Sequence, residues 1–201
     1  MSQRQTAPAT ARNREPILHH LKQWLPNRKG ALILEIAAGT GEHAVFFAPH
    51  FPQSVWQPTD MDPSAKASIS AWIAETGVEN VFDPLSLDVT DNRWPVDKAE
   101  GMLCINMIHI SPWAATESLM KGAQRTLSDG GVLVTYGPYK RHGQHTAPSN
   151  EAFNASLKAR NPEWGIRDLE AVVEEAEKNG MSCEEVAPMP ANNFCVLFRK
   201  G

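Results

Sequence analysis

Hydrophobic residues follow two alternating patterns along this chain. Short runs that are rich in apolar residues are typical of strands covered on both faces, and they occur at 31–36, 54–59, 81–87, 101–108, 132–136, 181–188 and 194–199. Between them, apolar residues recur every three or four positions. This spacing predicts amphipathic helices at 14–25, 41–49, 63–77, 111–127, 150–160 and 167–179.

Proline and glycine residues support these boundaries. Pro63 suits the first turn of a helix that Gly77 closes, and Ser111 before Pro112 is typical of a helix start. Pro84 favours an edge position for its strand. Strands separated by helices indicate a mainly parallel α/β sheet. The last two strands have no helix between them, so the final strand is expected to be antiparallel.

Composition narrows the class of protein. The chain has 201 residues, enough for one core, and a net charge of −4 with scattered lysines and arginines. No basic run marks a nucleic-acid surface, so the sequence gives no positive support for a nucleic-acid substrate. The polar N-terminus lacks the apolar segment of a signal peptide, and no apolar run is long enough for a membrane span. Three cysteines without a CxxC pair are typical of reduced thiols in a cytoplasmic protein. Oligomeric state is not indicated.

The segment LILEIAAGTGEHA, residues 32–44, carries the clearest chemistry. Its glycines allow a sharp strand-to-helix turn and a close approach of a ligand to the backbone. A dinucleotide is one candidate, because Gly39 to Ala44 match G-x-G-x-x-A and Asp60 follows at the spacing of a ribose-binding acid. However, Glu42 would repel a pyrophosphate at the helix start. A cationic ligand such as S-adenosylmethionine would instead be attracted by Glu35 and Glu42.

The order E-x-A-x-G-x-G after a strand, with Asp60 ending the next strand, resembles the class I S-adenosylmethionine-dependent methyltransferases. Ala37 replaces the first glycine of that motif, which is acceptable if its φ is negative. RNREPIL, WQPTDMDP, NMIHISPW, YGPYK and NPEWGIRDLE further resemble a branch that includes methyltransferase-like protein 26.

The resemblance implies a Rossmann-like α/β fold. Its sheet would be seven-stranded and mainly parallel, with an antiparallel last strand and helices on both faces. Residues 1–29 would form an N-terminal tail and lid helix, in which Arg12, Asn13 and Arg14 either cover the cofactor or form a solvated helix start. Residues 30–201 would form a single methyltransferase-like domain.

The same resemblance implies how S-adenosylmethionine would be bound. Glu35, Ala37, Gly39, Thr40 and Gly41 would form the turn beneath its amino-acid part and ribose. Asp60, followed by Met61, is the preferred ribose ligand. Asp62 is the rival, with helix capping as its alternative role. Asp88 and Val89 would contact adenine, or Asp88 would only cap a turn. Asn106 would hold the methionine part, or would be an internally bonded amide.

Three residues are candidates for catalysis. His109 follows the fourth strand and could accept a proton from the methyl acceptor, or it could shape the pocket. Tyr139 and His142 lie in the 137–149 loop, which is either a binding surface or a solvated loop. His142 and His145 lack the further ligands of a metal site, so no metal is expected.

These observations predict a methyltransferase that acts on a small molecule or on an exposed protein side chain. Two alternatives stay open. The G-x-G-x-x-A match allows an NAD(P)-dependent reductase. The lack of a recognisable acceptor motif allows a protein that binds the cofactor without turnover.

Overall fold

The computed structural model describes residues 3–201 and contains a seven-stranded sheet in the order β3-β2-β1-β4-β5-β9-β8. All neighbours are parallel except at β9, which is antiparallel to both β5 and β8. The strands are β1 (Ala31–Ile36), β2 (Ser54–Asp60), β3 (Leu85–Ser86), β4 (Ala99–Ile105), β5 (Leu127–Gly137), β8 (Met181–Met189) and β9 (Asn193–Lys200). The predicted fold class is therefore confirmed.

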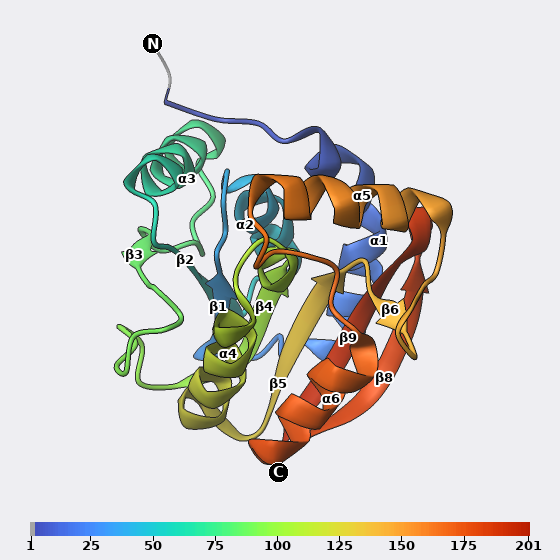
Figure 1. The fold of residues 1–201 in the computed structure, drawn as a ribbon. Helices are drawn as coiled ribbons and strands as arrows, with labels where there is room; N and C mark the ends of the chain where they lie inside the picture. The colour runs from blue at the N-terminus through green and yellow to red at the C-terminus, as the bar shows by residue number, and fades with distance from the viewer. Residues whose placement is uncertain (1–2) are drawn as a thin grey trace.

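Helices cover both faces of this sheet (Figure 1). They are α1 (Pro8–Trp24), α2 (Glu42–Phe47), α3 (Pro63–Thr76), α4 (Trp113–Thr126), α5 (Pro148–Arg160) and α6 (Leu169–Lys178). One core joins the sheet to α4 and α6 through Leu119 and Val172. The other joins it to α1 and α2 through Ile17 and Phe47. The alternation of side chains along each strand supplies both cores.

Several boundaries differ from the sequence predictions. The first helix begins at Pro8, because proline is favoured in a first turn, so Arg12, Asn13 and Arg14 lie inside it. Ser111 does not cap α4; its hydroxyl donates to the Met107 carbonyl, and Pro112 occupies the cap position. The Asp129–Gly131 segment is an irregular part of β5 rather than a turn before it. As Pro84 indicated, β3 is a short edge strand.

The 137–149 loop also contains structure that the sequence pattern did not predict. A small hairpin of β6 (Lys140–Arg141) and β7 (Gln144–His145) turns at His142. Its backbone N–H groups at 142 and 143 donate to Glu170 and Asp168 at the start of α6. The loop is therefore attached to α6.

Candidate functional site

A cavity of about 410 Å³ opens at the carboxyl ends of β1, β2 and β4. Ligands of open parallel sheets occupy this edge. The wall combines apolar side chains with two carboxylates and consists of Ile36, Ala37, Gly39, Asp60, Met61, Leu87, Asp88, Val89, Thr90, Ile105, Met107, Ile110, Ser111, Pro112 and Ala115. Met61 and Ile110 are 64% and 43% exposed, unusually high for large apolar side chains.

The glycine turn forms one side of this cavity. Gly39 has a φ of +58°, and a Cβ added there would meet no atom within 4 Å, so its open face is available to a ligand. Gly41 is required by packing, because an added Cβ would lie 2.8 Å from the Cα of Ile69. Ala37 adopts a φ of +53°, so the expected negative φ was wrong. An alanine in this left-handed region is strained by about 1 kcal/mol.

Asp60 lies on the cavity wall and also holds the glycine turn. Its Oδ2 accepts the Gly39 N–H at 2.9 Å, and its Oδ1 accepts the Asp62 N–H at 2.9 Å. Asp62 instead caps α3 by accepting the Ser64 N–H at 2.8 Å. Hydrogen bonds from Ser64 lower the pKa of Asp62. Asp62 does not line the cavity, so Asp60 is the carboxylate placed to meet a ligand.

Asp88 caps a turn and also borders the cavity. Its Oδ1 accepts the Thr90 N–H at 2.9 Å and the Thr90 hydroxyl at 2.7 Å, which caps the turn after β3. The same residue lines the cavity together with Val89. Asn106 directly follows β4 and has a φ of +61°, and its N–H donates to the Tyr136 carbonyl. Its neighbours Ile105 and Met107 line the cavity, but Asn106 itself does not.

Glu35 lies beneath the turn rather than on the cavity wall. The Trp56 indole N–H donates to its Oε2 at 2.6 Å. Complete burial raises the pKa of Glu35 to about 8, so its carboxyl group is mostly uncharged at pH 7. Its backbone carbonyl accepts the Thr59 hydroxyl at 2.8 Å. Glu35 therefore contacts the protein scaffold on both sides.

Thr40 and Glu42 connect the turn to the N-terminal segment. The Glu42 Oε2 accepts the Thr40 hydroxyl at 3.1 Å and the Ala7 N–H at 2.6 Å. The Ser68 hydroxyl donates to the Thr40 carbonyl and accepts the Gln5 N–H. Thr40 does not line the cavity.

The three candidate catalytic residues all lie outside the cavity wall. His109 is fully buried, and its Nδ1 accepts the Arg167 backbone N–H at 3.3 Å. Burial, together with the charge of Arg167, lowers the pKa of His109 to about 3. Because Nδ1 accepts a hydrogen bond, the proton of the neutral ring is on Nε2, which has no hydrogen-bond partner among residues 3–201.

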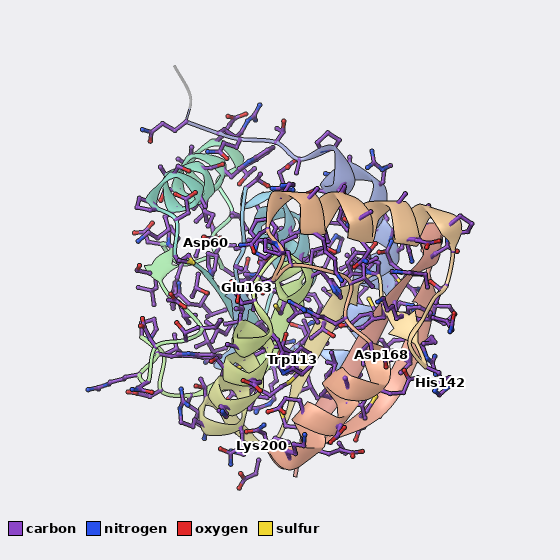
Figure 2. All side chains as sticks on the ribbon, viewed as in Figure 1. Asp60, Trp113, His142, Glu163, Asp168 and Lys200 are labelled. Atoms are coloured by element: carbon purple, nitrogen blue, oxygen red, sulfur yellow. The ribbon has the colours of Figure 1, made fainter. Side chains whose placement is uncertain are left out.

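Tyr139 and His142 occupy very different environments. The Tyr139 ring is buried against His109, its hydroxyl is 2.7 Å from the Thr135 hydroxyl, and burial raises its pKa. His142 has an 80% exposed side chain near Glu170. Figure 2 shows His142 and Asp60 on opposite sides of the molecule. The structure thus brings neither residue to the cavity.

One polar network was missed by sequence reasoning. His43 Nε2 lies 2.9 Å from Asn13 Oδ1, and the Asn13 side chain is also hydrogen-bonded to the Tyr136 phenol. Burial lowers the pKa of His43 to about 4. The network joins α1, α2 and the end of β5. Its members are far apart in sequence, so no local motif could have indicated it.

Among residues 3–201, no group of three or more His, Cys, Asp or Glu side chains could hold a metal ion. The cysteines Cys104, Cys183 and Cys195 are free thiols. In that same part of the chain, none of the helices has the length and apolar character needed to cross a membrane.

Comparison with known families matches residues 4–200 to a model described as a protein of unknown function, DUF938. The chain belongs to this family. The match covers nearly every element of the fold, from the N-terminal segment to β9. The description of the DUF938 family assigns no activity.

Solved structures similar to this DUF938 protein are methyltransferases. An O-methyltransferase family protein from Burkholderia thailandensis matches with a TM-score of 0.82 and 12% identity, over 96% of this chain and 57% of that one. An O-methyltransferase family 2 protein from Planctomyces limnophilus, in complex with apigenin, matches with a TM-score of 0.80 and 18% identity, over 96% of this chain and 60% of that one. Human N-acetylserotonin methyltransferase in complex with S-adenosylmethionine matches with a TM-score of 0.76 and 15% identity, over 96% of this chain and 53% of that one.

The DUF938 chain thus spans little more than half the length of these three proteins. At such low identity the likeness establishes a shared Rossmann-like fold. It identifies neither an activity nor an acceptor for this chain.

Proposed function

We propose that this protein is an S-adenosylmethionine-dependent methyltransferase acting on a small molecule or an exposed protein side chain. The observation that carries the proposal is the charge of the cavity. Within the described part of the chain, its lining includes two carboxylates, Asp60 and Asp88, and no lysine, arginine or histidine. Such a cavity attracts a cationic ligand. The apigenin-bound neighbour supports a small-molecule acceptor.

The residues present fit this cofactor. The open face of Gly39 leaves room beside the turn, and each Asp60 oxygen keeps a lone pair for a ribose hydroxyl. Asp88 has a second carboxylate oxygen for the adenine amino group, and the apolar walls suit the ring. We assign the turn from Glu35 to Gly41 and the flanking Met61, Val89 and Asn106 to the same cofactor. Glu35 and Thr40 would act by ordering the turn.

A dinucleotide fits less well, because its diphosphate needs free backbone donors. The Gly39 N–H already donates to Asp60, and the Gly41 N–H donates to the Ala38 carbonyl at 3.1 Å. Glu42 places a further carboxylate at the start of α2. A reductase is therefore not favoured, and the structural neighbours are methyltransferases.

The bound cofactor would supply a methyl carbon activated for in-line displacement by positive sulfur. The protein would orient the acceptor and exclude water from it. The tautomer of His109 does not suit a general base, because Nδ1 already accepts a hydrogen bond and only Nε2–H remains to donate one. His109, Tyr139 and His142 stay predictions for the acceptor side. None of them lines the cavity, so each would require rearrangement to reach a bound acceptor.

Residues 1–29 are proposed to act as a lid, although Met1 and Ser2 lie outside the described residues. The hydrogen bonds from Ala7 to Glu42 and from Gln5 to Ser68 support this role, since they hold the N-terminal segment near the glycine turn. Residues 30–201 would be the methyltransferase-like domain. Kinship with the methyltransferase-like protein 26 branch and a cytoplasmic location also stay predictions.

Thermal unfolding with S-adenosylhomocysteine, NAD and NADP tests the cofactor assignment. A ligand that binds only the folded protein raises the midpoint, so we expect a shift with S-adenosylhomocysteine alone. A shift with NAD alone would contradict the proposal. A screen of metabolites and peptides with methyl-labelled S-adenosylmethionine then tests turnover. Binding without any labelled product would favour a cofactor-binding protein.

A further inference from the structure

A second cavity lies on the side of the molecule covered by α4 and α6. Its volume is about 350 Å³, and it is lined by Trp113, Lys140, Asn154, Lys158, Pro162, Glu163, Trp164, Gly165, Ile166, Arg167, Asp168 and Ala171. Figure 2 labels three of these residues, Trp113, Glu163 and Asp168, on the face that carries α4 and α6. Most of the lining comes from the segment NPEWGIRD, which the cofactor assignment leaves unexplained.

Arg167 forms a wall between this cavity and the cofactor cavity. Its Nε–H donates to the Ile108 carbonyl at 2.8 Å, and Nη2 donates to the carbonyls of Ser111 and Glu163. Ser111 lines the first cavity, and Arg167 lines the second. The guanidinium is held by backbone carbonyls rather than by a carboxylate, so its charge is not neutralised locally.

The charge of the second cavity is opposite in character to that of the first. Lys140 and Lys158 form no ion pair within the described residues. Two carboxylates, Glu163 and Asp168, also line the cavity, and Asp168 accepts the Gly143 N–H. With Lys140, Lys158 and Arg167, the lining therefore carries three positive charges against two negative charges, a net charge of +1. This arrangement attracts an anion.

Two indole rings give the cavity a planar apolar surface. The Arg167 guanidinium carbon lies 5.8 Å from the Trp113 ring, and the Arg160 guanidinium carbon lies 5.1 Å from the Trp164 ring. The Trp113 N–H donates to Glu117, which is not part of the cavity wall. Aromatic faces of this kind pack well against a flat ring.

We propose that this second cavity binds a small organic anion, a carboxylate or phosphate attached to a planar ring. The free ammonium groups of Lys140 and Lys158 would hold the anion, and Trp113 and Trp164 would contact the ring. A methyl acceptor and an effector share this chemistry. The binding site itself does not depend on the proposed methyl transfer.

Calorimetric titration with phenyl phosphate and benzoate tests the site, with benzyl alcohol as the uncharged control. We expect saturable binding of both anions and none of the alcohol. The double variant K140A/K158A should bind each anion about tenfold more weakly. The matched variant K98A/K121A removes two exposed lysines elsewhere and should bind like the unmodified protein.

Three results would overturn the proposal. These are no saturable binding of either anion, equal binding of benzyl alcohol, or equal weakening in both double variants. Thermal unfolding of each variant checks that the fold is retained. Adding methyl-labelled S-adenosylmethionine to the bound probe then separates the two uses: a labelled probe identifies an acceptor site, and an unlabelled one an effector site. Failure of methyl transfer leaves the binding result unaffected.

Discussion

Asp60 and Glu35 are both acidic residues near the ends of neighbouring parallel strands, yet they occupy different physical environments. Asp60 borders the first cavity and accepts two backbone N–H groups. Glu35 points into the core around Trp56, where its carboxyl group accepts a hydrogen bond from the indole N–H. Burial raises the pKa of Glu35 to about 8, so it is mostly uncharged at pH 7.

This comparison shows that an acid near a ligand site need not contact the ligand. A carboxylate at a cavity wall can bind hydroxyl or amino groups. A buried carboxyl group with one neutral donor instead takes up a proton, because desolvation opposes its charged form. We therefore assign ligand binding to Asp60 and support of the scaffold to Glu35. The following predictions test that division.

The largest effect is expected from Asp60→Asn. The substitution keeps the size of the side chain but removes the charge that faces the cavity, and it weakens two charge-assisted interactions with the ribose. We expect roughly 100-fold weaker binding of S-adenosylhomocysteine by calorimetry, about 2.7 kcal/mol.

Asp62→Asn is the matched control for this experiment. Asparagine can still cap α3, and Asp62 does not line the cavity, so binding should be nearly unchanged. Equal losses in both variants would mean that the charge of the whole 60–62 segment matters. Unchanged binding in Asp60→Asn would refute the ribose assignment.

Glu35→Gln should change the pH dependence of stability more than ligand binding. In the unmodified protein, the folded carboxyl keeps its proton between its unfolded pKa near 4.5 and its folded pKa of about 8. The folded state therefore binds more protons in this range, and stability falls as pH rises, by up to about 1.4 kcal/mol per pH unit from this group. Gln removes this contribution and can still accept the Trp56 N–H.

Urea unfolding of both proteins between pH 5 and 9 measures that difference. The stability of Glu35→Gln relative to the unmodified protein should rise with pH and level off above pH 8. His109 and His43 titrate in both proteins, so their contributions cancel in the comparison. A difference that stays constant with pH would show that Glu35 is ionised in the folded state.

The smallest effect is expected from Ala37→Gly, at the turn between the two acids. Alanine at a φ of +53° is strained, and glycine is not. We expect a gain of about 1 kcal/mol, or roughly 2–4 °C in the thermal midpoint. A lower midpoint would show that the Ala37 methyl group contributes more through packing than its backbone strain costs.

Much of the fold was predictable because the spacing of apolar residues along the chain follows which side chains are buried. The apolar runs at 31–36 and 132–136 lie in buried strands, and the absence of a helix before 194–199 correctly predicted an antiparallel strand. Helix starts were less predictable. Pro8 begins α1 in a segment whose polar residues suggested a tail, because the contacts that support this turn come from elsewhere in the fold.

The candidate site was only partly predictable. Gly39, Asp60 and Asp88, which the motif and the family resemblance grouped as ligand-binding residues, line one cavity. Their role in binding a cofactor stays a prediction. The environment of His109 was not predictable, since its hydrogen-bond partner Arg167 lies 58 positions away in the sequence. The sequence placed Tyr139 and His142 in one loop, but one side chain is buried and the other is exposed.

The sequence by itself determined the order of strands and helices, the glycine turn and the acids beside it, because these depend on local conformation and on regular burial patterns. Tertiary structure alone decided which acids are charged, which histidine nitrogen carries a proton, and which cations face the second cavity. Those properties depend on desolvation and on hydrogen-bond partners that distant segments supply.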